Sequence, residues 1–298
     1  MKLILEYIDP VISVNSGQVF LWEKYNNSWY GINGKLVLKF TINTKFREEN
    51  IDIEYESTPE RCEWYGSFFR ADDDYQKIKK VLSGDHHINM LFEKYQGLRI
   101  IRQDPFQCII SFICASNNNI KRIRKILNNI CRLFGKSIEF DDKKFNLFPT
   151  SKELCKASIT ELQNCGLGYR AKYVKAITKK IYSGELNLEY LKKISYQKAK
   201  TELIKNFGIG NKTADCILLF SLEKIKSFPI DTWILKSLIN NYYWLVDEHI
   251  STDMDKKVLS SKTYSIIQRD IRNYFGNYSG YAQQYLYYDI RNNSGKKW

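Results

Sequence analysis

The chain has 298 residues, which is long enough for one large hydrophobic core or for two to three smaller ones. Lys and Arg outnumber Asp and Glu by 46 to 33, and the formal charge of +13 favours a polyanionic partner, either nucleic acid or a membrane surface. The apolar run CILLFSL is far too short to span a bilayer, and Glu6 and Asp9 come too early for a signal peptide, so we expect neither.

The first third of the chain predicts a sheet. In WYGINGKLVLKF, strand-like residues flank Asn33 and Gly34, and this dipeptide is the strongest short signal for a β-hairpin. The segments QVFLWEKY and IDIEYES continue the strand character. We therefore expect a small antiparallel β-rich N-terminal domain over residues 1–98.

From about Tyr75 the pattern turns helical. Residues 104–135 space apolar side chains three and four apart, Asp104-Pro105 suits a helix start, and SNNN separates two helices. Later helices are expected in FPTSKELCKASITELQNCG, RAKYVKAITKKIYSG, SYQKAKTELIKNFG, TWILKSLINNYYW and NYSGYAQQYLYYDIRNN. The predicted fold class is α+β, with a mostly α-helical body over residues 99–298.

The stretch KTELIKNFGIGNKTADCILLF predicts a helix, a tight turn and a second helix over about residues 198–222. Gly208 and Gly210 permit a close backbone approach that a Cβ would block, and the free N–H groups of the second helix suit a nucleic-acid phosphate. Two nucleotide-binding motifs are excluded. Asn211 stands where a Walker loop needs its second glycine, and Thr213 stands where a dinucleotide loop needs its third.

Lys212 lies at a helix N-terminus, where the helix dipole disfavours a cation. It is either a solvated surface cation or an amine nucleophile whose pKa is lowered by the helix terminus and by partial desolvation. Asp231 precedes another helix and can cap it, and as a carboxylate it can also stabilise positive charge developing on a sugar. Asp215 is a rival partner, but its spacing from Lys212 favours an ion pair on the helix surface.

The lysine of the hairpin and an aspartate 19 residues later form part of a longer set of motifs. These are NSGQVFLW, CASNNNIKRI, GLGYRAKYV, GIGNKTADC, PID and GYAQQYLYY, and they span residues 15–288. In this order they resemble the 8-oxoguanine DNA glycosylase/AP lyases of the helix-hairpin-helix DNA glycosylase superfamily. The resemblance implies that the helical body is a helix-hairpin-helix glycosylase core preceded by the N-terminal domain of that family.

The resemblance implies a role for each residue of a base pocket. Lys212 would attack the sugar C1′ and become the Schiff-base amine, while Asp231 would stabilise the oxocarbenium-like transition state. The Gly17 carbonyl would accept the N7–H that 8-oxoguanine has and guanine lacks. Gln283 would read the Watson–Crick edge, and the base would lie between two side chains, those of Tyr287 and Cys216.

The resemblance also implies contacts with the opposite strand. Asn117 would fill the hole left by the flipped base, Arg122 and Arg170 would read the orphaned cytosine, and Tyr169 would act as a wedge. The residues alone favour plainer roles for these positions and for the base-reading set. These are a strand bulge at Gly17, a core thiol at Cys216, a surface amide at Gln283, a helix end at Asn117 and phosphate contacts at Arg122 and Arg170.

The chain departs from well-known members at two positions, with Trp233 where a histidine is frequent and Tyr287 in place of phenylalanine. These departures bear on opposite-base stringency and on flanking contacts, whereas the catalytic pair is retained.

Cysteine and histidine usage predicts no disulfide and no metal site. No Cys follows Cys216, so the iron–sulfur ligands of the endonuclease III branch are absent. His86 and His87 adjoin Asp85 on an expected loop, and His249 stands alone, so we expect solvated histidines. The seven cysteines include no C-x-x-C pair, which is typical of a reduced intracellular chain: Cys62, Cys108, Cys114, Cys131, Cys155, Cys165 and Cys216.

The expected function is excision of 8-oxoguanine, opposite cytosine, from duplex DNA, with strand cleavage by β-elimination. The expected protein needs no cofactor and is a monomer, cytoplasmic and nucleoid-associated in a prokaryote or nuclear in a eukaryote. Two alternatives stay open: a monofunctional alkyl-base glycosylase, and a non-catalytic protein that binds DNA through the hairpin. A Schiff-base trap identifies the first alternative, and a Lys212→Gln variant with unchanged function identifies the second.

Overall fold

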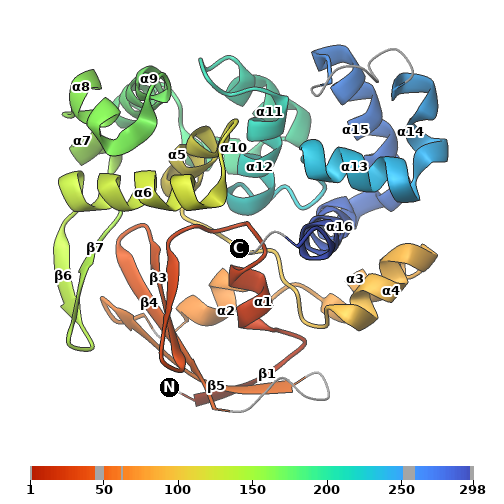
Figure 1. Cartoon of the computed structure of the whole chain (residues 1–298), viewed down its shortest axis with the longest axis horizontal. Coiled ribbons are helices and arrows are strands. Elements are labelled where there is room, and N and C mark those ends of the chain that lie inside the picture. The colour runs from red at the N-terminus through yellow and green to blue at the C-terminus, as the bar shows by residue number, and fades with distance from the viewer. Residues whose placement is uncertain (1, 44–49, 62, 251–258, 296–298) are drawn as a thin grey trace.

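The structure is a computed structural model that describes residues 2–43, 50–61, 63–250 and 259–295 (Figure 1). Cys62 therefore lies outside the described residues. The N-terminal part contains a five-stranded antiparallel sheet of order β1-β5-β4-β3-β2. Its strands are β1 (Lys2–Glu6), β2 (Trp22–Tyr25), β3 (Ser28–Asn33), β4 (Leu36–Ile42) and β5 (Asn50–Thr58). Asn33 pairs with Leu36 across the turn, which confirms the predicted hairpin.

Two short helices, α1 (Pro10–Val14) and α2 (Trp64–Phe68), interrupt the region that was predicted to be sheet. Their apolar residues share a buried cluster with Trp22, Leu38 and Phe40 of the sheet. The sheet therefore buries one face against its own helices and forms the smaller of two hydrophobic cores.

The larger core lies in the helical body, where α5 (Pro105–Ala115) is buried along most of its length. Asp104 caps α5, with Pro105 as its first residue, and Asn119 caps α6 (Ile120–Phe134), so both predicted starts are confirmed. Further helices are α9 (Arg170–Ser183), α10 (Leu188–Lys193), α11 (Tyr196–Ile204), α12 (Asn211–Ser221), α13 (Thr232–Asn241), α14 (Tyr243–Ile250) and α15 (Ser261–Phe275). The predicted α+β fold is thus confirmed.

One element was missed, and two local predictions were wrong. The β-hairpin of β6 (Ser137–Phe140) and β7 (Lys143–Asn146) was not predicted, although its two turn aspartates have the positive φ that Asp tolerates well. The single helix expected over residues 148–166 is two short helices, α7 (Ser151–Leu154) and α8 (Ile159–Leu162), followed by a π-helical turn. Each short helix starts at its own capping box, which explains the break. His86 begins a helix and does not lie on a loop.

The two cores meet at residues 100 and 101, where Ile100 belongs to the larger cluster and Ile101 to the smaller. Helices α3 (Tyr75–Leu82) and α4 (His86–Lys94) contribute to the larger core, and α4 packs against α16 (Ser279–Asn293), as Figure 1 shows. The boundary expected between residues 98 and 99 stays a prediction.

Among the described residues, no helix has both the length and the apolar character needed to cross a membrane.

Candidate active site

The predicted helix-hairpin-helix is formed by α11, a turn at residues 205–210, and α12. Gly208 has a φ of +89°, and a Cβ on it would lie 2.4 Å from the Tyr173 ring, so the turn requires glycine there. Gly210 is the N-cap of α12, and a Cβ on it would meet no atom within 4 Å. The backbone at the start of α12 is therefore open on this side.

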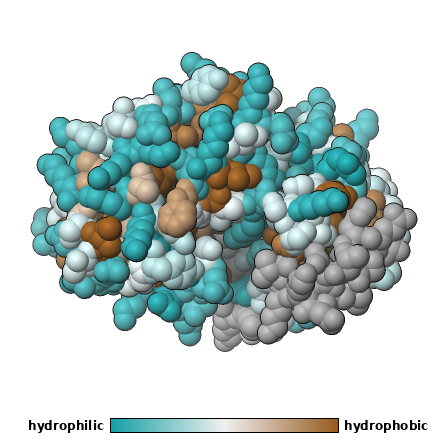
Figure 2. All heavy atoms as spheres, turned by 90° about the horizontal axis from the view of Figure 1, so that it is seen from above, coloured by the Kyte–Doolittle hydropathy of each residue, from teal (hydrophilic) through white to brown (hydrophobic). Residues whose placement is uncertain are grey.

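An open groove of about 550 Å³ runs along this turn. We call it the hairpin groove; it is lined by Ser116, Tyr169, Tyr173 and residues 204–210. Phe207 is 68% exposed at the turn and packs edge-on against Tyr173. Viewed from above, the molecule shows hydrophobic side chains scattered among hydrophilic ones (Figure 2). The sequence signal for Phe207 was an aromatic residue inside a glycine turn, and it was missed.

Lys212 is the second residue of α12, with its Nζ 5.5 Å from the centre of the Phe112 ring. One helical turn later, Cys216 is buried and hydrogen-bonds to Lys212. Burial raises the pKa of Cys216 to about 12, so it is a neutral thiol at neutral pH. Within the described residues Lys212 forms no ion pair. Its ammonium is therefore held by weak partners.

The pKa of Lys212 is raised, contrary to the predicted decrease. Desolvation lowers this pKa, but Cys216 and the Asp231 carboxylate raise it by more. The prediction was wrong because it considered only the helix terminus and burial. In the free protein Lys212 is protonated at neutral pH.

Asp231 caps α13, as predicted: its Oδ1 accepts hydrogen bonds from the backbone N–H groups of Trp233 at 3.0 Å and Ile234 at 2.8 Å. Both bonds use the same oxygen. The other oxygen has no hydrogen bond within the described part of the chain. The cap therefore fixes the carboxylate while leaving one oxygen available, and its charge is near enough to influence Lys212.

Asp215 is not on the helix surface, so the prediction of an exposed ion pair was wrong. It is fully buried, and its Oδ2 lies 2.8 Å from Lys200 Nζ and 2.7 Å from the hydroxyl of Tyr264. Tyr196 and Gln268 also donate to its carboxylate. The reason is that α12 packs against α5, α11 and α15, which leaves no solvated face at this position.

The base-reading residues expected on α16 lie on one side of that helix, one turn apart. Gln283 is 5% exposed, and its Nε2 donates to the carbonyl of Pro229 at 3.2 Å. Its Oε1 is buried with no hydrogen-bond partner in the described structure. Burial and the charge of Asp231 raise the pKa of Tyr287. Gln283 is thus not a surface amide, and α16 stands close to the segment that carries Asp231.

Gly17 has a φ of +77° in a turn after α1, so it is not a strand bulge. The carbonyl of the preceding Ser16 accepts a hydrogen bond from Gln284 Nε2 at 2.9 Å. This bond places the turn beside α16 and next to Gln283.

The residues expected at the opposite strand also gather. Asn117 has a φ of +47° between α5 and α6, and the buried Arg170 donates to its carbonyl at 3.0 Å and to that of Ser116. The Arg170 guanidinium lies 4.4 Å from the centre of the exposed Tyr169 ring. Arg122 is exposed in the first turn of α6. Arg170 therefore shapes the Asn117 turn, and its role as a base reader stays a prediction.

Trp233 lies in the first turn of α13, with the guanidinium of Arg291 at 4.9 Å from its ring. Arg291 was not predicted, although its spacing of four from Tyr287 on one helix is a signal for a shared face. Within the described residues no group of three His, Cys, Asp or Glu side chains is arranged to hold a metal ion.

The chain was compared with known families and proteins. The N-terminal domain model of 8-oxoguanine DNA glycosylase matches residues 5–109, and the model of HhH-GPD superfamily base excision DNA repair proteins matches residues 110–270. The Clostridium acetobutylicum 8-oxoguanine glycosylase/lyase, solved with dsDNA containing cytosine opposite 8-oxoG, is 34% identical with a TM-score of 0.84. That match covers 98% of this chain and 96% of that chain.

Two further relatives match this chain less completely than the Clostridium protein does. The Arabidopsis thaliana protein named N-glycosylase/DNA lyase OGG1 is 33% identical over 207 residues, which is 68% of this chain but 54% of that protein, so the match spans about half of its length. A Bacillus subtilis DNA-3-methyladenine glycosylase is 24% identical over 77% of this chain and 82% of its own length. From both domain matches and the Clostridium structure, the chain belongs to the 8-oxoguanine DNA glycosylase/AP lyase family of the HhH-GPD superfamily.

Proposed function

We propose that this protein excises 8-oxoguanine from duplex DNA, opposite cytosine, and then cleaves the strand as an AP lyase. The observation that carries the proposal is Lys212 at the start of the hairpin helix, without an ion pair in the described structure and within the influence of Asp231. The proposal is supported by the Clostridium protein, whose name and bound DNA match this activity.

The chemistry starts with extrusion of the damaged nucleotide, which costs a few kcal/mol of stacking energy. Lys212 must lose its proton before its Nζ attacks C1′. The glycosidic bond then breaks, and the base leaves with the bonding electrons. The Asp231 carboxylate stabilises the positive charge that develops on the sugar.

The second step uses the same lysine. The C1′–O4′ bond of the Lys212 adduct then breaks, with a proton passing to O4′, and leaves a Schiff base between Lys212 and C1′. This Schiff base withdraws electrons, so the C2′ proton becomes acidic. Its removal, with the expelled base as the proton acceptor that the family resemblance implies, forms a C1′–C2′ enamine and then breaks the bond from C3′ to the phosphate oxygen. Water releases the lysine. Both bond cleavages therefore depend on one amine.

Base recognition follows from the pocket walls. The Gly17 carbonyl accepts the N7–H of 8-oxoguanine, and Gln283 offers its buried Oε1 to N–H groups on the Watson–Crick edge. An acceptor buried without a partner destabilises the empty protein by about 1 to 3 kcal/mol, so a base that satisfies it binds more tightly. Tyr287 and Cys216 contact the two faces of the base.

The hairpin groove binds the DNA backbone. Gly208 and Gly210 bring backbone N–H groups close to a phosphate, while Asn117 and Tyr169 enter the duplex and Arg122 and Arg170 contact the unpaired cytosine. The charge of +13 adds counterion release, so affinity falls steeply with salt. The protein acts as a monomer wherever the DNA is, in the nucleoid or in a nucleus.

Borohydride trapping on a duplex with 8-oxoguanine opposite cytosine tests the proposal. The wild type should form a covalent adduct, and Lys212→Gln should form none. Lys180→Gln is the matched control, because Lys180 is a helix lysine that is partly exposed, paired with Glu185 and outside the hairpin groove; it should keep the adduct. Base release by wild type and Lys212→Gln without any adduct would assign the chain to the monofunctional glycosylases.

A further inference from the structure

Residues 16–18 are here called the Gly17 turn. Buried hydrogen bonds hold the backbone of this turn on both sides of Gly17. The carbonyl of Ser16 accepts from Gln284 Nε2 at 2.9 Å, and the carbonyl of Gln18 accepts from Gln103 Nε2 at 2.9 Å. Ser16, Gln18, Gln103 and Gln284 are all buried. Within the described residues no hydrogen bond reaches the carbonyl of Gly17, which lies between the two bonded carbonyls.

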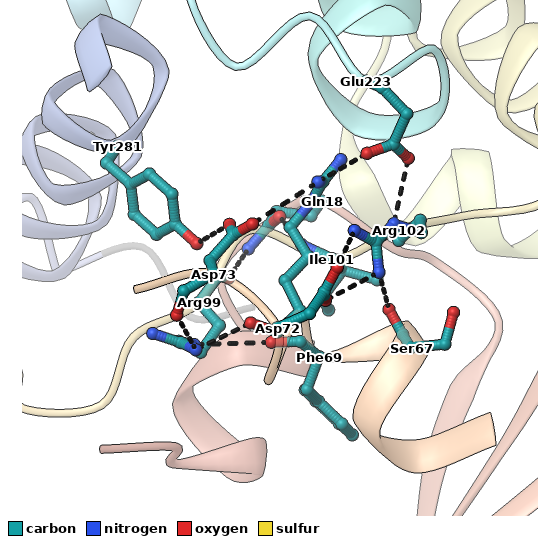
Figure 3. Close-up of polar contacts among 11 residues, drawn as sticks. Gln18, Ser67, Phe69, Asp72, Asp73, Arg99, Ile101, Arg102, Glu223 and Tyr281 are labelled. Atoms are coloured by element: carbon teal, nitrogen blue, oxygen red, sulfur yellow. Dashed lines mark hydrogen bonds and ion pairs between the residues drawn. The ribbon is translucent and has the colours of Figure 1, made fainter. Parts of the chain in front are cut away.

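The side chain of Gln18 adds a second restraint. Its Nε2 donates to the carbonyl of Arg99 and to the hydroxyl of Ser16, each at 2.8 Å, and its Oε1 accepts from the backbone N–H of Ile101 at 2.7 Å. Figure 3 shows Gln18 beside Arg99 and Ile101. Both N–H donors of this amide and one of the two lone pairs of its oxygen are thus committed to fixed backbone groups or to Ser16.

The backbone segment that hydrogen-bonds to Gln18, residues 99–101, is itself held in place by side-chain contacts. Arg99 Nη2 donates to the carbonyl of Arg70 at 2.7 Å, and Arg102 bonds to Asp72 at 3.0 Å and to Glu223 at 2.9 Å (Figure 3). Glu223 lies two residues after the end of α12. Residues 99–102 therefore form a fixed support between the N-terminal domain and the helical body.

Two of the three glutamines connect the Gly17 turn to the walls of the pocket. Gln284 follows Gln283 on α16, and the Oε1 of Gln283 is buried without a hydrogen-bond partner in the described part of the chain. The backbone N–H of Gln103 donates to the carbonyl of Phe220 at 2.9 Å, and Phe220 lies on α12, the helix of Lys212. These hydrogen bonds thus fix the position of the Gly17 carbonyl relative to two helices, α16 with Gln283 and α12 with Lys212.

Rigidity matters here because a carbonyl that faces N7 distinguishes 8-oxoguanine from guanine by a single hydrogen. In 8-oxoguanine N7 carries a hydrogen and attracts a carbonyl, whereas in guanine N7 carries a lone pair and repels it. A carbonyl that could rotate would escape the repulsion and lose the discrimination. A carbonyl whose neighbouring peptide groups are both bonded cannot turn away without breaking buried hydrogen bonds.

We propose that Gln18, Gln103 and Gln284 are specificity-positioning residues that hold the Gly17 carbonyl against the N7 edge of the flipped base. The proposal rests on the proposed function, because it needs 8-oxoguanine in the pocket. The three residues should matter for excision of 8-oxoguanine but not for cleavage at a preformed abasic site. An abasic site has no base to read, so β-elimination there does not need the Gly17 carbonyl.

The test compares two substrates under single-turnover conditions, 8-oxoguanine opposite cytosine and an abasic site opposite cytosine. Gln103→Met and Gln284→Met remove the donor at nearly constant volume. Each should slow excision of 8-oxoguanine about tenfold, as expected when a buried carbonyl loses its partner, and should change abasic-site cleavage less than about twofold. Retained abasic-site cleavage also shows that the variant is folded.

Gln107→Met is the matched control. Gln107 and Gln103 are each 5% exposed, and the amide of Gln107 also bonds two backbone groups, Ile32 O at 2.8 Å and Gly34 N at 2.7 Å. It holds a different turn of the sheet, so both rates should stay as in the wild type. Equal slowing of both substrates in Gln103→Met and Gln284→Met, or no slowing of either, overturns the positioning role.

Failure of the proposed function gives a different result. In that case the wild type itself would leave 8-oxoguanine in place while the abasic site is cleaved, or would act on neither substrate. If instead the wild type excises 8-oxoguanine and the variants match it, only the positioning role is wrong.

Discussion

Two lysines of the helix-hairpin-helix, Lys200 on α11 and Lys212 on α12, differ in how their charges are satisfied. Lys200 is 6% exposed, and its Nζ lies 2.8 Å from Asp215 and 3.2 Å from the Tyr196 hydroxyl. The Tyr264 ring centre is 5.1 Å away. Lys212 is only partly buried and has a thiol and an aromatic ring as its nearest partners.

The difference separates a cation held in a buried ion pair, Lys200, from the cation that we propose to be the nucleophile, Lys212. An ammonium in a buried ion pair cannot leave without exposing an uncompensated charge, so its removal is costly. An ammonium outside any ion pair can move toward a substrate, once it has lost its proton, without leaving a buried countercharge unpaired. The four experiments below test this contrast, from the largest expected effect to the smallest.

Replacing Lys200 by Met should reduce the free energy of unfolding by about 3–5 kcal/mol, because Asp215 would remain charged and buried. Lys212→Gln should change the same quantity by about 1 kcal/mol or less, since no ion pair of Lys212 is broken in the described structure. Urea denaturation of both variants measures the two values. Equal losses of stability would remove the distinction between the two lysines.

The hydroxyl of Tyr264 connects the Lys200–Asp215 pair to the segment that carries Asp231, the proposed catalytic carboxylate. It donates to Asp215 at 2.7 Å and accepts from the backbone N–H of Ile230, the residue before Asp231, at 3.1 Å. Tyr264→Phe should lower stability by about 1–3 kcal/mol and slow base excision about tenfold, because the segment carrying Asp231 loses a fixed contact. Thermal denaturation and single-turnover rates measure these effects.

Tyr242→Phe is the control for that experiment. Tyr242 is also buried, and its hydroxyl donates to Asp85 at 2.9 Å, in a different part of the helical body. It should lose some stability but keep the excision rate. A slowed Tyr242→Phe, or a Tyr264→Phe that excises at the wild-type rate, would show that the hydroxyl acts on stability alone.

The pH dependence of excision should follow the raised pKa of Lys212. Below that pKa the fraction of free amine increases tenfold for each pH unit, a factor equal to about 1.4 kcal/mol. When attack by Lys212 limits the rate, single-turnover excision should therefore rise about tenfold per unit between pH 7 and pH 9. A rate that is flat over this range would indicate that the amine is already deprotonated in the DNA complex.

The sequence identified features whose signals are local. The caps at Asp104 and Asp231, the Asn33-Gly34 turn and the hairpin of Lys212 each depend on a few adjacent residues. The structure alone revealed contacts between distant residues. Gln284 meets Ser16 across 268 positions and Gln103 meets Gln18 across 85. Asp215 was assigned to the surface because its spacing of three from Lys212 suits an ion pair along one helix, whereas the packing of α11 and α15 on α12 depends on distant residues.

The smallest effect is expected at the far end of α12, where Glu223 pairs with Arg70 at 2.7 Å and Arg102 at 2.9 Å. Glu223 is 36% exposed, and a Gln there still accepts from one of the two arginines, so Glu223→Gln should reduce stability by about 1 kcal/mol or less. Desolvation raises the pKa of Glu223, but Arg70 and Arg102 lower it by more. Because the folded-state pKa is the lower one, the charged pair stabilises the fold at neutral pH and this contribution disappears as the pH falls through that pKa. The stability difference between wild type and variant, followed by urea denaturation from pH 7 to pH 3, should shrink towards acid; a difference that grows instead would show that Glu223 is destabilised by burial, as an unpaired carboxylate would be.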